Sequence, residues 1–236
     1  MQPPLFYSEK NVALNESIVL DEDTSRHIIQ VLRMKKSEQL QLTDGKGNLL
    51  TGSIIDDHKK KVVFRAEGTR HEKQGEKKIT LAVSLLKNNS RFEWLLEKAT
   101  EIGITEIIPM ICERTERQHF RLDRMRNILV SAMLQSRQCW LPVINEPVQF
   151  KQAVETAGHQ QKFIAHCIEE EKRNLADLLN ESLPARIVLI GPEGDFTNEE
   201  VGLALKHHFV AASLGENRLR AETAGIVAAT LLKFSS

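Results

Sequence analysis

The sequence has little cysteine, and its three cysteines are not arranged as a binding site. Cys112, Cys139 and Cys167 show neither C-x-x-C spacing nor a paired-histidine pattern among the 236 residues. Zinc sites and disulfide frameworks need clustered cysteines, so neither is expected. Free cysteine is usually buried as a small apolar residue, and we predict three buried thiols and no metal site.

Long apolar runs are also missing. No uncharged stretch approaches the roughly 18 residues that a membrane-spanning helix needs. The first residues contain prolines and Glu9, whereas a secretory signal has a basic and then an apolar region. We therefore expect a cytoplasmic protein with no membrane partner.

Charge of one sign is not in excess, because 32 lysines and arginines balance 32 aspartates and glutamates. Net charge therefore does not indicate a nucleic-acid partner. Segment 114–137 is nevertheless basic, with only Glu116 and Asp123 against six arginines. Such a patch attracts polyanions whatever the total charge, although a solvated helix face would look the same. The six are Arg114, Arg117, Arg121, Arg124, Arg126 and Arg137.

Residues 1–72 are predicted to form a small β-rich barrel. Gly45 and Gly47 lie between two expected strands and can take positive φ, which favours a hairpin there. The polar segment 70–78 has a central glycine and is expected to link this domain to the next. The strands are expected at 4–8, 17–20, 39–43, 49–56 and 62–66, with one helix over about 22–33.

From residue 79 onward strands and helices alternate, which predicts a parallel sheet covered by helices. This second domain is expected to span 73–236. Ser90 with Glu93, and Thr197 with Glu200, have the spacing of capping boxes and predict two helix starts. Strands are expected at 79–86, 107–111, 163–167, 187–190 and 210–213, and other helices at 121–137, 147–157, 172–180 and 222–234.

Residues 187–197 hold the strongest candidate for a binding loop. An apolar strand runs directly into Gly191, Pro192 and Gly194 and then into a capped helix. Ligands of open α/β sheets bind at the carboxyl ends of strands, and glycine lets the backbone approach a ligand closely. The segment is neither G-x-G-x-x-G nor a P-loop, which disfavours Rossmann nucleotide binding and phosphate hydrolysis. A plain tight turn stays an alternative.

Two further strand ends carry charged residues. Arg220 and Glu222 follow the expected strand 210–213, where they could face the same crevice or pair with each other. Lys87 and Arg91 lie at another strand-to-helix turn, which could equally be a solvated helix start. All four positions are expected at the edge of the sheet where ligands bind.

Five motifs follow one another along the whole chain. They are Arg26-His27 with Val31-Leu32-Arg33, Glu97-Lys98-Ala99-Thr100-Glu101-Ile102-Gly103, Gln135-Ser136-Arg137, Gly191-Pro192-Glu193-Gly194, and Leu214-Gly215 with Leu219-Arg220-Ala221-Glu222-Thr223-Ala224. In this order they resemble the ribosomal small-subunit methyltransferase E family of the SPOUT superfamily. Asp195 departs from the family pattern, which has glycine there. Asn217 replaces the family arginine, and Arg218 follows it.

The resemblance implies an α/β fold in which a SPOUT-type, trefoil-knotted parallel sheet follows a PUA-like β-barrel that helps to hold RNA. It also implies that a homodimer methylates N3 of a uridine in 16S ribosomal RNA of the small subunit, using S-adenosylmethionine. The cofactor would lie among three loops at the knot. Its implied contacts are Ala165, His166, Leu189, Ile190, Gly191, Pro192, Gly194, Leu214, Gly215, Asn217, Leu219, Ala221 and Thr223.

Three residues are candidates for the chemistry. Arg220 could stabilise charge on a uracil oxygen, while Glu193 or Glu222 could accept the proton of N3. Two alternatives stay open, namely a SPOUT methyltransferase with another RNA target and a non-catalytic ribosome-assembly protein that binds RNA. The candidate RNA-binding residues are Arg26, His27, Arg33, Lys87, Arg91, Arg114, Arg117, Arg121 and Arg137.

Overall fold

The computed structural model describes residues 2–10, 12–168 and 171–235, which form two compact units. The first unit comprises Met1–Gln74 together with Met133–Leu141. The second comprises Gly75–Ala132 together with Pro142–Ser236. Segment 133–141 thus packs with the N-terminal unit, although the residues on both sides of it belong to the second unit.

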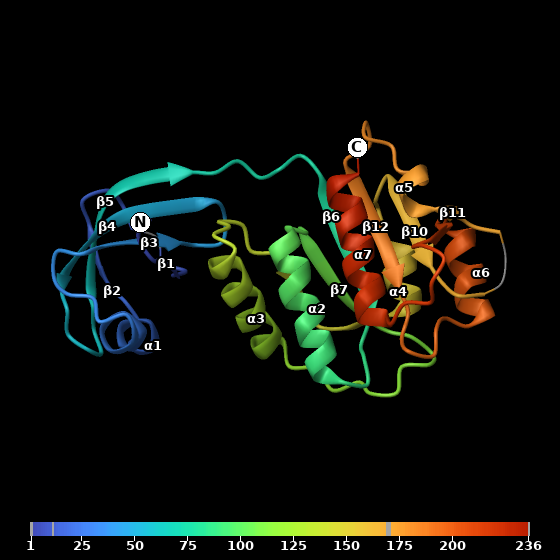
Figure 1. Cartoon of the computed structure of the whole chain (residues 1–236), viewed down its shortest axis with the longest axis horizontal. Coiled ribbons are helices and arrows are strands. Elements are labelled where there is room, and N and C mark those ends of the chain that lie inside the picture. Colours follow the sequence, from blue (N-terminus) through green and yellow to red (C-terminus); the bar gives the residue numbers. More distant parts are fainter. Residues whose placement is uncertain (1, 11, 169–170, 236) are drawn as a thin grey trace. The chain divides into compact units, whose positions relative to one another are not determined.

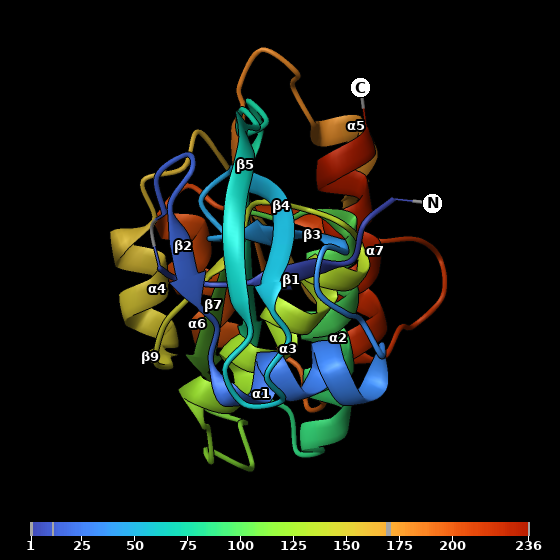
Figure 2. The same ribbon diagram turned by 90° about the vertical axis from the view of Figure 1, so that its left-hand side faces the viewer.

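The first unit is built on a five-stranded sheet in the order β1-β3-β4-β5-β2 (Figure 2). The β1–β3 pair is parallel and the other pairs are antiparallel. Apolar residues at alternate positions, including Leu40, Leu42 and Phe64, are buried together with Ile28 from a helical segment. The strands are β1 (Leu5–Tyr7), β2 (Ser17–Val19), β3 (Gln39–Thr43), β4 (Asn48–Asp56) and β5 (Val63–His71).

The hairpin between β3 and β4 is confirmed, and segment 133–141 packs against it. Gly45 and Gly47 have φ values of 71° and 88°, a region that favours glycine. The N–H of Gly47 donates to the carbonyl of Cys139 at 2.8 Å. A Cβ at Gly47 would lie 2.6 Å from the Trp140 ring, so the close approach also requires glycine. The indole N–H of Trp140 donates to the carbonyl of Glu72 at 2.9 Å and fixes the segment further.

The second unit contains an eight-stranded sheet in the order β11-β13-β10-β12-β6-β7-β8, with β9 also paired to β7. Every pair is parallel, as the alternation of strands and helices predicts. The strands are β6 (Lys78–Ser84), β7 (Glu106–Ile111), β8 (Val143–Ile144), β9 (Val148–Gln149), β10 (Gln161–Ala165), β11 (Arg173–Asn174), β12 (Ala185–Ile190) and β13 (Val210–Ser213).

Helices cover both faces of this sheet (Figures 1 and 2). α2 and α7 pack together, and α7 lies on β6 and β12. On the opposite face α4 and α6 pack against a core that includes Ile187 and Leu189 of β12. The helices are α2 (Asn89–Ile102), α3 (Leu122–Gln135), α4 (Phe150–Thr156), α5 (Leu175–Leu178), α6 (Asn198–Lys206) and α7 (Ala221–Phe234).

Two predictions for the N-terminal half are wrong in detail. The helix expected over 22–33 is a short α1 (Glu22–Arg26) followed by a π-helical turn, η1 (His27–Val31). It ends before Arg33, which has a φ of 56°. The linker expected over 70–78 is shorter, because β5 continues to His71 and β6 begins at Lys78.

Two helices expected in the second domain begin later than predicted. Val148 pairs with Met110 of β7, so the segment expected as helix 147–157 starts as β9 and becomes helical at Phe150. In the same way, Arg173 pairs with Ala212 of β13 before the short helix α5. Pairing to an existing strand edge therefore overrides the helical pattern at both positions.

One of the two predicted capping boxes is confirmed. Thr197 caps α6, and Glu200 returns the bond to the Thr197 backbone. The box expected from Ser90 to Glu93 is wrong, because the Asn88 side chain accepts from the backbone of Ser90 and caps α2. Glu93 instead receives a bidentate bond from Arg124, at 2.6 and 2.9 Å.

The cysteine prediction holds at two of three positions. Cys112 and Cys139 are buried, whereas Cys167 is exposed. Burial raises the pKa of the Cys112 thiol to about 12, so this thiol stays protonated and inert at neutral pH. Within the described part of the chain, no helix is long and apolar enough to cross a bilayer.

Candidate active site

Three loops meet at the carboxyl edge of the second unit's sheet. β10 lies between β12 and β13 and is parallel to both. The strand at 210–213 is therefore not a direct neighbour of the strand at 187–190, although their loops still open on the same edge. The loops are 191–197 after β12, 166–168 after β10 and 214–220 after β13.

These loops enclose two adjoining cavities of about 290 and 350 Å³. The first is lined by Arg91, Ala165, Cys167, Ile190, Gly191, Pro192, Glu193, Asp195, Arg218, Leu219, Arg220, Ala221 and Ala224. The second is lined by Ala165, His166, Cys167, Lys172, Ala212, Ser213, Leu214, Gly215, Glu216, Asn217, Arg218, Leu219 and Ala224. We treat the two as one site, the loop cavity, because five residues line both, namely Ala165, Cys167, Arg218, Leu219 and Ala224.

The loop after β12 is a tight turn with a fixed shape. The N–H of Asp195 donates to the carbonyl of Pro192 at 2.9 Å and closes the turn. Asp195 has a φ of 64°, in the left-handed region that aspartate tolerates better than most residues. A Cβ at Gly191 would lie 3.2 Å from the Phe196 ring, which leaves little room for a side chain. The turn and the cavity wall are thus the same structure.

Arg114 holds this loop from the outside. Its Nη1 donates to the carbonyls of Gly194 and Phe196, at 2.7 and 3.3 Å. Arg114 is a candidate RNA-binding residue by sequence, but in the structure its guanidinium is bound to these two backbone carbonyls. Gly194 does not line the loop cavity, and its Cβ position faces the Arg114 side chain at 3.4 Å.

Glu193 projects from the same loop towards the strand-to-helix turn after β6. Its Oε1 accepts from the backbone N–H of Lys87 at 3.1 Å. The Lys87 ammonium pairs with Glu116 at 2.7 Å, and this hydrogen bond raises the pKa of Lys87. Both groups are exposed, so the pair contributes little to stability.

A more open concavity of about 630 Å³ adjoins the loop cavity. Glu222 lies in it with only 8% of its surface exposed, and its Oε1 is 3.6 Å from Arg91 Nε. Of the two alternatives for Arg220 and Glu222, an ion pair between them is thus not the one formed, because Glu222 faces Arg91. Among the described residues the Arg220 guanidinium has no hydrogen-bond or ion-pair partner, and only the Arg220 carbonyl is bonded, to the N–H of Ala224 in the first turn of α7. The lining residues are Ser90, Arg91, Trp94, Arg218, Leu219, Arg220, Glu222 and Thr223.

Most residues expected to contact the cofactor line these spaces. Leu189 does not, because it is fully buried in the core between the sheet, α4 and α6. Cys167, Lys172, Arg218 and Ala224 line the loop cavity but were not predicted, and Lys172 has no sequence signal that marks it. The expected residues that line the spaces are Ala165, His166, Ile190, Gly191, Pro192, Leu214, Gly215, Asn217, Leu219, Ala221 and Thr223.

Some of the residues expected to bind RNA already have partners within the protein, and others do not. In the first unit Arg26 pairs with Glu22, and Arg137 donates to the Gln41 side chain at 2.8 Å. His27 packs edge-on against Phe6. Three exposed guanidiniums have no partner among the residues that the structure covers. They are those of Arg33, Arg117 and Arg121.

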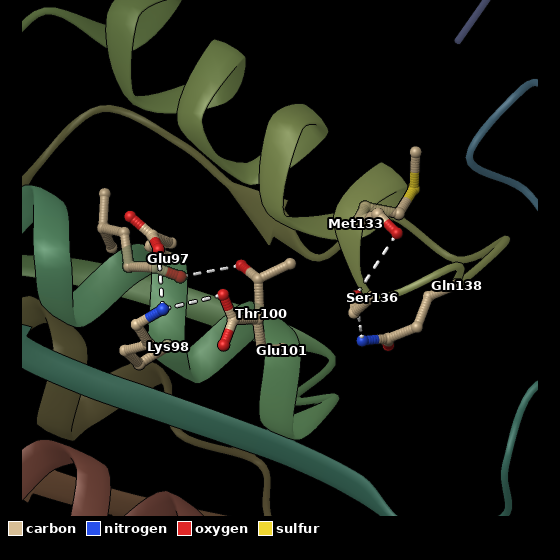
Figure 3. Close-up of polar contacts among 8 residues, drawn as sticks. Glu97, Lys98, Thr100, Glu101, Met133, Ser136 and Gln138 are labelled. Carbon is tan, nitrogen blue, oxygen red and sulfur yellow. Dashed lines mark hydrogen bonds and ion pairs between the residues drawn. The ribbon is translucent and has the colours of Figure 1, made fainter. Parts of the chain in front are cut away.

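Other motif residues make contacts within their own segments. Lys98 on α2 pairs with Glu97 at 2.7 Å and with Glu101 at 2.9 Å, and the Thr100 hydroxyl donates to the carbonyl of Leu96 (Figure 3). Separately, the Ser136 hydroxyl donates to the carbonyl of Met133 at 3.3 Å, after the end of α3 (Figure 3). In the described ranges no group of three or more metal-binding side chains occurs.

Comparison with known proteins identifies the family. The RNA methyltransferase domain family matches residues 73–233, and the RNA methyltransferase PUA domain family matches residues 20–67. A ribosomal RNA small subunit methyltransferase E from Synechocystis is 31% identical over 91% of this chain and 72% of its own length.

Two solved structures are similar over nearly the full length. A probable rRNA methyltransferase from Porphyromonas gingivalis is 35% identical, with a TM-score of 0.88 over 96% of this chain and 95% of its own. A ribosomal RNA small subunit methyltransferase E from Neisseria gonorrhoeae, bound to S-adenosyl methionine, is 28% identical, with a TM-score of 0.87 over 97% and 95%. The expected combination of a PUA domain and a SPOUT α/β domain is confirmed, and the chain belongs to the ribosomal RNA small subunit methyltransferase E family of RNA-methylating enzymes.

Proposed function

We propose that this enzyme transfers a methyl group from S-adenosylmethionine to N3 of a uridine in 16S ribosomal RNA. The observation that carries the proposal is the adjacency of two spaces. The loop cavity is the less open of the two and suits a small cofactor, and the concavity beside it holds Glu222 and is also lined by Arg220. The two spaces share four lining residues, namely Arg91, Arg218, Leu219 and Arg220.

The loop cavity fits the cofactor in size and character. The two cavities together fall within the range of about 300–1,000 Å³ that is usual for small-molecule sites. Ala165, Ile190 and Leu219 supply apolar walls, and Gly191 and Gly215 expose backbone groups. S-adenosylmethionine supplies an already activated methyl group, so the protein's task is mainly to position the reactants.

The concavity supplies the polar groups that the acceptor base needs. N3 of uracil carries a proton near neutral pH, and a carboxylate can accept it. Glu222 is better placed than Glu193, because its Oε2 is buried and has no hydrogen-bond partner among the described residues. Glu193 is exposed and its Oε1 already accepts from the Lys87 backbone. Arg220, which is unpaired, would stabilise negative charge on a uracil oxygen.

We further propose that two copies associate through α2 and α7. Trp94 on α2 and Phe234 at the end of α7 are 44% and 66% exposed, and α2 and α7 pack together, so a second copy could cover both side chains. Trp94→Glu should lower the molar mass in sedimentation equilibrium from dimer to monomer. Val31→Glu, which changes another exposed apolar residue in the first unit, should leave the mass unchanged. A wild-type monomer would contradict the proposal.

The proposed reaction is tested by identifying the product. Small ribosomal subunits from cells that lack their own enzyme of this family would be incubated with the protein and isotope-labelled S-adenosylmethionine. Digestion to nucleosides and mass spectrometry should then show labelled 3-methyluridine in 16S ribosomal RNA. Label on another atom or another RNA would support a different target for the same fold, and would overturn the assignment of N3.

A further inference from the structure

Two charged side chains hold the loop that follows β10. The backbone N–H of Cys167 donates to Asp195 Oδ2 at 2.7 Å. The Lys172 ammonium donates to the carbonyls of His166 and Ile168, at 2.8 and 2.6 Å. Backbone groups of three successive residues are therefore fixed by side chains. Cys167, Asp195 and Lys172 also line the loop cavity, so the bonds lie in its wall.

Asp195 connects two of the three loops that form this cavity. Its Oδ1 accepts from the N–H of Phe196 at 2.8 Å, within the loop after β12. Its Oδ2 reaches across to Cys167 at the end of β10. Asp195 takes part in no ion pair among the described residues, so backbone N–H groups are its partners. Bonds from N–H groups to a carboxylate are about twice as strong as neutral ones.

The backbone at this position does not itself require a carboxylate. A φ of 64° is tolerated by aspartate and asparagine and is readily adopted by glycine. The turn is also closed by a bond between backbone atoms of Asp195 and Pro192. What the side chain adds beyond the turn is the connection to Cys167.

We propose that Asp195 is a positioning residue that sets the separation of the β10 and β12 loops before the cofactor binds. A cavity fixed in advance binds its ligand more tightly, because less ordering is needed on binding. The inference rests on S-adenosylmethionine as the ligand of the loop cavity.

Two variants separate the carboxylate from the backbone conformation. Asp195→Gly keeps the left-handed backbone and loses both side-chain bonds, and we expect the Kd for S-adenosylmethionine to rise about tenfold. Asp195→Asn retains one carbonyl oxygen as an acceptor, so its Kd should rise less. In both variants the KM for S-adenosylmethionine should rise by more than kcat falls, because the chemical groups are unchanged.

Amide hydrogen exchange provides a readout that does not need the cofactor. In the free protein the Cys167 amide should exchange about tenfold faster in Asp195→Gly than in wild type. A matched control is Asp21→Asn, which alters a carboxylate that accepts a backbone N–H at the start of α1 in the first unit. This control should change neither Cys167 exchange nor the Kd for S-adenosylmethionine.

The outcomes distinguish this inference from the proposed function. If wild type binds S-adenosylmethionine and both Asp195 variants bind it equally well, with unchanged Cys167 exchange, the positioning role is overturned. If wild type does not bind the cofactor, the proposed function fails, while the exchange of the Cys167 amide still tests the connection itself. Faster exchange together with weaker binding in Asp195→Gly, and an intermediate Asp195→Asn, would establish the role.

Discussion

Arg91 Nε lies 3.6 Å from Glu222 Oε1 and joins the first turn of α2 to the first turn of α7. The contact occupies one oxygen of Glu222 and leaves Oε2 buried without a hydrogen-bond partner among the described residues. Arg220, two residues earlier, is exposed and unpaired beside the same concavity. The concavity thus holds the Glu222 carboxylate, fixed by Arg91, and the free Arg220 guanidinium. This arrangement suits a proton acceptor beside a group that stabilises negative charge.

The first prediction concerns this carboxylate. Glu222→Gln keeps the shape of the side chain but removes its capacity to accept a proton as a carboxylate. We expect kcat for methyl transfer to fall about 100-fold or more, because general-base catalysis contributes roughly 10²–10⁴-fold. The Kd for S-adenosylmethionine should change little, since Glu222 does not line the loop cavity.

The control for this prediction is Glu199→Gln, which alters an exposed glutamate in the first turn of α6. Its kcat should equal that of wild type. Single-turnover methyl transfer measures both variants without interference from product release. A Glu222→Gln enzyme with wild-type kcat would exclude Glu222 as the base and return the role to Glu193.

The second prediction concerns Arg114, whose guanidinium holds the carbonyls of Gly194 and Phe196. Arg114→Ala should loosen the loop after β12 and raise the Kd for S-adenosylmethionine about tenfold, as expected for the loss of hydrogen bonds from a charged donor. Isothermal titration measures this change. Arg121→Ala is the control, and it should leave cofactor affinity unchanged. If Arg114→Ala weakens RNA binding and leaves cofactor affinity unchanged, Arg114 contacts RNA and does not hold the loop after β12.

The sequence was sufficient to predict the layers of the fold and the edge that carries the site. The apolar strand predicted at 187–190 leads into Gly191, and in the structure it is part of β12, because a buried parallel strand leaves a continuous apolar run. The glycines at 45 and 47 likewise marked the hairpin. Both features depend on residues that are adjacent in the chain, so the sequence pattern is enough to predict them.

The features that were missed depend on residues far apart in the chain. The sequence does not show that Trp140 packs on Gly47, or that Arg114 holds Gly194, because the fold brings each pair together. The capping box expected at Ser90 failed for a related reason. Asn88 caps the helix locally, which leaves Glu93 to pair with Arg124 from α3. Pattern alone also overestimated how many of the basic residues are free.

The third prediction concerns binding to RNA. Phosphate contacts by lysine and arginine make RNA affinity fall as salt rises. Each lost contact makes the negative slope of log association constant against log salt concentration shallower by about one. We expect this shallower slope for each of three variants whose guanidiniums are exposed and unpaired in the structure, Arg33→Ala, Arg117→Ala and Arg121→Ala. Arg26→Ala should change the slope less, since Arg26 pairs with Glu22. Equal slopes for all four variants would contradict this division.

The fourth prediction concerns stability in acid. The bidentate bond from Arg124 lowers the pKa of Glu93 below its ordinary value of 4.5, so the unfolded chain binds a proton at this residue more readily than the folded one. The stabilisation is present above about pH 4.5 and is lost as the pH falls through the lowered pKa. Since Arg124 is largely exposed, we expect this stabilisation of the folded state to be small.

Urea unfolding at several pH values tests this. At pH 7 Glu93→Gln should be less stable than wild type, and the difference should shrink as the pH falls below about 4.5. Glu146→Gln, which alters an exposed glutamate on a loop, should show no such pH-dependent difference. A difference for Glu93→Gln that does not change with pH would mean that the ion pair is not its cause.

The central claim is that the loop cavity binds S-adenosylmethionine and thereby supports methylation. Ala165 ends β10 and lines both parts of the cavity, so Ala165→Phe should fill it while the sheet remains folded. The most direct measurement is isothermal titration of S-adenosylmethionine into wild type and into this variant, with thermal unfolding to check the fold. The account predicts saturable binding to wild type and none to folded Ala165→Phe. Absence of binding to wild type, or equal binding to both proteins, would contradict it.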